Sequence, residues 1–307
     1  MTYLLLAIFF STSTALILKY SESNKLNRNI VTSVNYVIAS IFSLVILLSV
    51  NIEFSLDNLN LDLLLPIFNG HENTALSNQG SILWSLIIGV VTGISYYLGF
   101  ILIQISIKKN GVGLTGAFSK LGIFIPIVFS IVIWNEIPDF IKIVGIVLTI
   151  TSIFIINKPE KDKNFFQNFN LLLILVLFVV GTGDFANKIF EKYANIEYKT
   201  LFLLVLFSSA LISSLFFTLR DLIIRKYKIT FKDILIGLLV GIPNLFTSYF
   251  LIESFVYYDT GVVFSIFSAG TILMITLGAV TIFKEKLSQR EYFGIGVIIL
   301  ALILLNV

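Results

Sequence analysis

The chain has 307 residues, of which 57% are hydrophobic and only 13% charged, and its mean hydropathy is +0.97. A soluble protein carries roughly twice that share of charged residues, so the composition predicts an integral membrane protein. The absence of cysteine excludes disulfides and thiolate metal sites, and the net charge of +3 comes without the clustered basic stripe that nucleic-acid binding requires.

Apolar segments long enough to cross a ~30 Å hydrocarbon core fill most of the chain. No cationic region precedes the first of them and no small-residue cleavage site follows it, which favours a membrane helix over a removed signal peptide. The pattern predicts ten spans, at residues 2–20, 32–50, 82–107, 111–134, 140–156, 170–190, 200–219, 234–257, 260–283 and 289–306. The long connection at 51–81 contains an apolar stretch at 61–68 that is too short to span. We expect an exposed loop there, with an interfacial helical turn or a lid as the alternatives.

A diverged copy of residues 89–157 returns at 237–306. At offsets of 148 and then 149 residues the matching positions are Gly89/Gly237, Gly93/Gly241, Gly113/Gly261, Phe118/Phe267, Ser119/Ser268, Glu136/Glu285, Gly145/Gly294 and Asn157/Asn306. Five predicted spans fall in each half, and an odd number reverses the direction in which the second copy enters the membrane. We therefore predict an all-α membrane protein of two inverted-topology five-helix repeats, at 1–157 and 170–307, joined by a charged linker at 158–169.

The basic residues are unevenly divided between the two sides of the predicted membrane. Of the 21 Lys and Arg residues, sixteen fall in or beside the connections between spans 1–2, 3–4, 5–6, 7–8 and 9–10. Because basic loops stay in the cytoplasm, this distribution predicts that both termini face outward from a cell membrane. The many Ile, Asn and Lys residues favour a bacterial inner membrane.

Four charged residues stand out within the predicted spans, because a charge at the centre of a membrane helix costs about 2.5–3.5 kcal/mol on insertion scales. They are Lys120, Asp184, Lys188 and Glu253. Lys120 either has a functional role, in which it binds an anionic group or pairs with an acid across a cavity, or forms a purely structural ion pair. Asp184 and Glu253 are predicted at similar depth, so they either bind a cation or carry protons together, or they pair separately on their own helices. Lys188 shares a helix face with Asp184 and lies near enough to the helix end to reach the interface.

Neutral side chains in the spans supply further candidates for substrate contact. Asn187, Gln104, Asn244, Asn35 and Tyr36 can donate or accept hydrogen bonds, although each alone is more often a contact between helices. Tyr97 and Tyr249, with Tyr96 and Phe250 beside them, offer aromatic faces for a cation or a stacked ligand. In a chain with 14% aromatic residues, this second signal is weak.

Two glycine pairs occupy matching places in the halves, Gly89 with Gly93 and Gly237 with Gly241. Small residues four apart allow the backbones of membrane helices to approach closely, so we expect the same packing role in each half. Pro243 and Pro126 each remove a backbone donor inside a span, and each predicts a kink.

The two five-helix halves, each with a Glu in the turn before a Gly-containing last helix, resemble the drug/metabolite transporter superfamily and its EamA-like members. The residues that carry the resemblance are Asn110 to Gly113, Phe118-Ser119, Trp134 to Glu136 and Gly145, with Thr260-Gly261, Phe267-Ser268, Phe283 to Glu285 and Gly294 in the second half. The resemblance implies that spans 1, 3, 4, 6, 8 and 9 line a central cavity. It also implies a turn-stabilising role for Glu136 and Glu285. Many relatives place their termini in the cytoplasm, which is the reverse of the topology predicted from loop charge.

These observations predict a secondary transporter that moves a small polar or amphipathic metabolite, such as an amino acid or an organic cation, by alternating access. No G-x-x-x-x-G-K-[ST] loop is present, so a gradient is the expected driving force, with proton coupling as one option. No catalytic group, metal or cofactor is expected, because the single histidine lies in a predicted loop. The alternative is a membrane-embedded enzyme or flippase that acts on a lipid-linked carrier.

Overall fold

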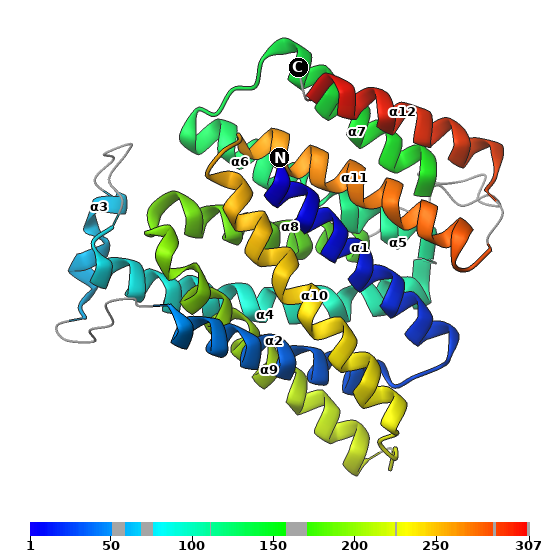
Figure 1. The fold of residues 1–307 in the computed structure, drawn as a ribbon, viewed down its shortest axis with the longest axis horizontal. Helices are drawn as coiled ribbons and strands as arrows, with labels where there is room; N and C mark the ends of the chain where they lie inside the picture. Colours follow the sequence, from blue (N-terminus) through cyan, green and yellow to red (C-terminus); the bar gives the residue numbers. More distant parts are fainter. Residues whose placement is uncertain are drawn as a thin grey trace.

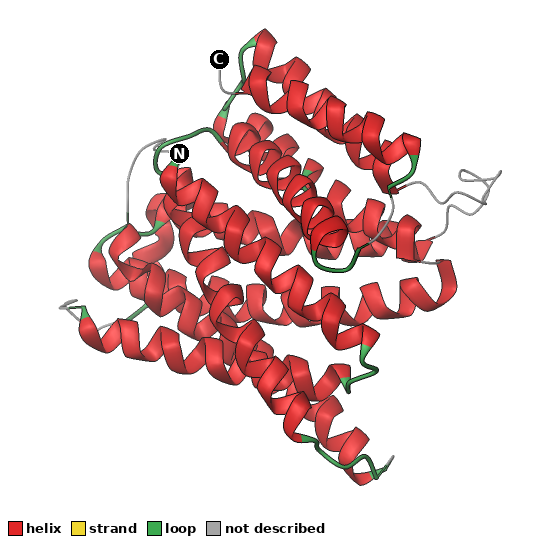
Figure 2. Ribbon diagram, turned by 45° about the vertical axis from the view of Figure 1, so that its right-hand side comes forward, coloured by secondary structure: helices red, strands yellow, loops and turns green. Residues whose placement is uncertain are grey.

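The computed structural model of the chain describes residues 1–50, 59–68, 76–110, 112–157, 171–224, 226–284 and 287–305. Within these ranges the protein is all-helical, and the prediction of an all-α fold is confirmed (Figure 2). The helices are α1 (Thr2–Ser23), α2 (Arg28–Ser49), a 3₁₀ turn η1 (Leu61–Leu64), α3 (Leu65–Phe68), α4 (Asn78–Asn110), α5 (Val112–Leu121), α6 (Phe124–Trp134), α7 (Phe140–Asn157), α8 (Leu171–Tyr193), η2 (Ile196–Tyr198), α9 (Lys199–Ile223), α10 (Phe231–Phe255), α11 (Thr260–Thr281) and α12 (Gln289–Leu305). The predicted linker at 158–169 and Glu285 lie outside the described residues.

Each predicted apolar segment is helical. By length and composition, seven of the described helices can cross a membrane, while the apolar helical segments Phe118–Trp134 and Phe140–Ile155 are shorter and the first of them is interrupted by a turn. The stretch at 61–68 forms short helices rather than an extended loop, and its Leu64 side chain is buried. These features fit a multi-pass membrane protein, as the composition predicted.

The predicted span at 111–134 is not one helix, because the chain turns at Gly122 and Ile123 between α5 and α6. Pro126 explains the break, since a proline cannot donate to the carbonyl four residues before it. The Gly122 carbonyl accepts instead from Ile125 N, at 3.0 Å. At Pro243, by contrast, the helix is not interrupted, and α10 continues through the proline from Phe231 to Phe255.

The helix ends define two faces of the molecule. We call the face at which the chain begins the N-terminal face. There the Met1 ammonium donates to the Tyr258 hydroxyl at 2.6 Å, at the connection between α10 and α11. On the opposite face, Asn27 N donates to Asp233 Oδ1 at 2.9 Å, at the starts of α2 and α10. We call this second face the basic face, because the predicted loops rich in Lys and Arg lie there.

Two close helix contacts frame the interior. Helix α4 packs on α9 at Gly89 and Gly93, and α10 packs on α2 at Gly237 and Gly241. A Cβ atom at Gly93 would lie 2.2 Å from the carbonyl oxygen of Leu206, so only glycine allows this approach. Helix α1 packs on α10 and α11, helix α8 packs on α4 and α5, and α7 and α12 pair with each other at one edge of the molecule (Figure 1).

Gly93→Ala should destabilise the protein by about 1–3 kcal/mol, because the new methyl group forces α4 and α9 apart. Gly296→Ala is the matched control, since no heavy atom lies within 4 Å of the added Cβ there. We expect a lower melting temperature in detergent for the first variant alone. Equal melting temperatures for the two variants would show that the α4–α9 contact is not close.

Candidate functional site

A cavity of about 310 Å³ lies at the centre of the helices. Its walls come from α1, α2, α4, α5, α8, α10 and α11, which includes every span that the family resemblance implied and adds α2. The polar residues of the lining are Ser11, Thr14, Thr32, Asn35, Tyr36, Ser95, Tyr96, Lys120, Asp184, Asn244, Thr247 and Ser248. A small polar ligand would therefore find hydrogen-bonding groups on most sides.

Lys120 and Asp184 are the two charged residues of this lining. Lys120 is in the last turn of α5 and Asp184 is in the middle of α8, so one comes from each half of the chain. The two side chains interact electrostatically, but no ion pair within 4.0 Å forms between them or with another described residue. The cavity thus presents a cation and an anion that are near each other and not in contact.

A glycine contact sets the relative positions of these two charges. Gly122, two residues after Lys120, meets Gly181, three residues before Asp184, and a Cβ at Gly122 would lie 2.9 Å from Gly181 N. The turn between α5 and α6 is therefore in direct contact with α8. The cation also lies at the C-terminal end of α5, where the helix dipole favours positive charge.

Two hydrogen bonds join helices around the cavity. Asn244 Nδ2 on α10 donates to Asn35 Oδ1 on α2 at 3.1 Å. Asn187 Nδ2 on α8 donates to the Tyr96 hydroxyl on α4 at 2.9 Å. Asn244 is thus a lining residue, as predicted, whereas Asn187 is fully buried behind the cavity and positions Tyr96.

Tyr97 and Gln104 were predicted to contact a substrate, but neither lines the cavity. The Tyr97 ring packs 5.5 Å from that of Phe217 on α9, because adjacent residues on a helix point about 100° apart. Tyr96, the neighbour of Tyr97, faces the cavity instead. The Gln104 Nε2 atom is buried without a hydrogen-bond partner among the described residues.

Glu253 and Tyr249 also lie away from the cavity. Glu253 Oε1 accepts from Lys199 Nζ, and the same ammonium lies 4.5 Å from the centre of the Tyr249 ring. This pair joins the start of α9 to the end of α10 at the N-terminal face. Glu253 therefore has its own cation and does not pair across the cavity with Asp184.

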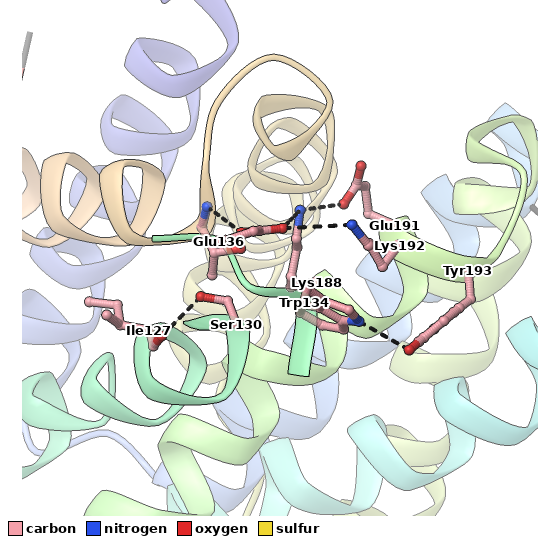
Figure 3. Close-up of polar contacts among 9 residues, drawn as sticks. Ile127, Ser130, Trp134, Glu136, Lys188, Glu191, Lys192 and Tyr193 are labelled. Carbon is pink, nitrogen blue, oxygen red and sulfur yellow. Dashed lines mark hydrogen bonds and ion pairs between the residues drawn. The ribbon is translucent and has the colours of Figure 1, made fainter. Parts of the chain in front are cut away.

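A second group of charges, which we call the Glu136 cluster, consists of Glu136, Lys188, Glu191 and Lys192 at the N-terminal face (Figure 3). Lys188 Nζ lies 2.8 Å from Glu191 and 3.4 Å from Glu136, so it pairs with these acids rather than with Asp184. Lys192 Nζ is 3.9 Å from Glu136. The sequence indicated Glu136 as a turn residue, but it did not reveal these partners.

Glu136 also holds the first residue of α11. Its Oε2 atom accepts from Thr260 N at 3.1 Å and from the Thr260 hydroxyl at 2.6 Å. The carboxylate therefore accepts hydrogen bonds from donors at a helix N-terminus that have no partner within the helix. Negative charge is favoured at this end of a helix. Glu136 was expected to stabilise its own turn, and its carboxylate instead bonds to the start of a helix in the second half of the chain.

A larger cavity, of about 610 Å³, adjoins the Glu136 cluster at the N-terminal face, and we call it the vestibule. Its lining includes Met1, Lys142 and the residues from Phe255 to Asp259, together with the whole Glu136 cluster. No group of three His, Cys, Asp or Glu residues suited to a metal ion is present in the part of the chain that the structure describes. Charged and hydrogen-bonding side chains line both cavities.

Three similarities to known proteins fit this architecture. The chain is 26% identical over 300 residues to an uncharacterized protein of Haemophilus influenzae. The aligned region covers 95% of this chain and 93% of that protein. A protein of known crystal structure shares the fold with a TM-score of 0.69 at 14% identity, over 99% of this chain and 94% of the other. The family model of the EamA-like transporter family matches residues 1–158, which is half of the chain. The resemblance drawn from the sequence is thereby confirmed, and the chain belongs to the EamA-like transporter family, whose members are membrane proteins that generally transport small molecules.

Proposed function

We propose that the protein is a secondary transporter for a small zwitterion, such as an amino acid, with an organic cation as the nearest alternative substrate. The observation that carries this proposal is the separated pair of Lys120 and Asp184 in the central cavity. A buried charge without a close partner is costly, and a ligand with a carboxylate and an ammonium group would supply a partner to each. The cavity volume also lies at the small end of the range for ligand sites.

The packing of the helices supports ten spans in two inverted repeats, at 1–157 and 170–307. In the two proposed repeats, α1 corresponds to α8, α2 to α9 and α4 to α10. The glycine contact of α4 with α9 then becomes that of α10 with α2, and the contact of α1 with α10 becomes that of α8 with α4. The family model also ends at residue 158, one residue beyond the first proposed repeat. Two such repeats around a central site are the usual framework for alternating access.

The position of the cavity suggests which side it serves in this conformation. Leu18 and Val31 line it, and both are near the basic-face ends of α1 and α2. At the N-terminal face the Glu136 cluster lies over it. With the basic face in the cytoplasm of a bacterial cell, as loop charge predicts, this is an inward-facing arrangement. A gradient would drive transport, and Asp184 is the candidate group for proton coupling.

A thermal-shift experiment on the purified protein tests the substrate class, because a ligand of the folded state raises the melting temperature with its occupancy. The panel consists of amino acids, the matching amines without a carboxylate, and the matching carboxylic acids without an amine. An amino acid should stabilise the wild type. Asp184→Asn and Lys120→Gln should each weaken its binding by about 30-fold or more, as expected for the loss of one partner of a buried charge pair.

Glu22→Gln is the control for this experiment, since Glu22 forms an exposed ion pair with Arg28 near the basic face. It should leave the response unchanged. Responses to amines that survive Lys120→Gln would assign an organic cation instead of a zwitterion. A ligand response that survives in both Asp184→Asn and Lys120→Gln would show that the central cavity is not the substrate site.

Glu253→Gln should have the opposite profile, with a lower melting temperature and an unchanged ligand response. The substitution leaves the Lys199 ammonium, which is 13% exposed, without its carboxylate. Removing one partner of a largely buried pair costs about 3–5 kcal/mol, and the partial exposure here reduces that to about 1–3 kcal/mol. The double variant Lys199→Gln/Glu253→Gln should recover part of the loss. Strictly additive losses in a double-mutant cycle would contradict the pairing.

A further inference from the structure

The central cavity and the vestibule are separated by a thin layer of protein. On α8, Asp184 lines the central cavity and Lys188 lines the vestibule, one helical turn or about 6 Å further along. On α11, Ile266 faces the vestibule and the next residue, Phe267, faces the central cavity. A small rearrangement of this layer would therefore join the two cavities.

The Glu136 cluster lies at this layer and connects the two halves of the chain. Glu136 comes from the connection between α6 and α7 in the first half, whereas Lys188 and Lys192 belong to α8 in the second (Figure 3). The Lys188 side chain is 5% exposed and that of Glu136 is 14% exposed. Lys188 Nζ also lies 5.4 Å from the centre of the Phe255 ring at the end of α10. The cluster thus draws α6, α8, α10 and α11 together above the substrate cavity.

We propose that Glu136, Lys188 and Lys192 form an ionic gate that closes the central cavity toward the N-terminal face. The gate rests on the proposed function, because alternating access requires that the same cavity open to each face in turn. Movement of α8 away from the connection between α6 and α7 would separate Lys188 from Glu136. The vestibule is already next to both groups, so water from it would hydrate the charges as they part.

Lys188 has a second acidic partner, Glu191, so the proposed gate can be weakened without destabilising the fold. In Glu136→Gln, Lys188 keeps Glu191 at 2.8 Å and is not left as an isolated buried charge. The glutamine retains a carbonyl oxygen for the Thr260 donors, so the start of α11 stays capped. The substitution therefore removes the charge attraction between the halves and preserves the folded arrangement on each side.

The chain contains no cysteine, so a single Thr247→Cys in the cavity lining provides a clean reporter. Membrane vesicles of both orientations are treated with a charged, membrane-impermeant maleimide. In the Thr247→Cys parent we expect labelling from the basic face and protection from the N-terminal face. Adding Glu136→Gln should raise the labelling rate from the N-terminal face about tenfold or more, the population shift that a loss of about 1.4 kcal/mol produces.

Three further variants sharpen the test. Lys192→Gln should give a smaller increase, because its ion pair is 3.9 Å long. Glu136→Asp keeps the charge and should restore most of the protection. Glu22→Gln, which removes an exposed ion pair near the basic face, should label as the parent does. A merely structural cluster would lower the melting temperature of these variants without changing the side from which the cysteine reacts.

The outcomes distinguish the gate from the transporter assignment. If the cysteine reacts from the basic face and a folded Glu136→Gln variant stays protected from the N-terminal face, or if the parent already reacts from the N-terminal face, the gate is wrong and the proposed function stands. If the cysteine reacts from neither face in any variant, alternating access through this cavity is itself overturned.

Discussion

Close approach of helix backbones at glycine is the constraint on which the rest of the structure depends. Inside a membrane, apolar side chains gain little by leaving lipid, so packing and interhelical contacts must hold the helices together. Gly93 on α4 and Gly241 on α10 allow this at matching contacts, with α9 and α2 respectively. The four helices pack side by side in the order α4, α9, α2, α10, and the outer two contacts of this row are made at glycine. The polar faces of α2, α4 and α10 then remain directed inward, and the central cavity lies between them and the inner helices.

Charges within the helices follow a consistent division. Near the N-terminal face they are paired, Lys199 with Glu253 and Lys188 with two acids, and these pairs join helices. In the central cavity, Lys120 and Asp184 form no ion pair with each other, although the segments that carry them meet at the contact of Gly122 with Gly181. An ion pair between them would have satisfied both charges and left little for a ligand. Because the two charges are not paired, the cost of removing them from water is not offset within the protein. A ligand bound in the proposed substrate site would reduce this cost.

Much of this arrangement is visible in the sequence, because helical periodicity decides which residues share a face. Thr32, Asn35 and Tyr36 on α2 have the same i, i+3, i+4 spacing as Asn244, Thr247 and Ser248 on α10, and both sets line the cavity. The pairing of Glu253 with Lys199 could not be predicted in this way, since it depends on the relative rotation of two helices. The same limit explains why the sequence predicts contact with a substrate for both Tyr96 and Tyr97, although only Tyr96 lines the cavity. Pro126 indicated a distortion between α5 and α6. Only the hydrogen bonds of the structure show that the break lies four residues earlier, at Gly122.

The proposed duplication also shows where the halves differ, and the differences gather at the substrate site. At the offset of 149 residues, Lys120 corresponds to Ala269, Gly122 to Thr271 and Pro126 to Ile275. Helix α11 accordingly runs unbroken through Thr271, whereas α5 and α6 are separate and carry the cation beside the break. The glycines that frame the cavity are present in both halves. In the proposed mechanism, a symmetric frame with an asymmetric site would let the two halves exchange conformations while the substrate binds in one orientation, between Lys120 of the first half and Asp184 of the second.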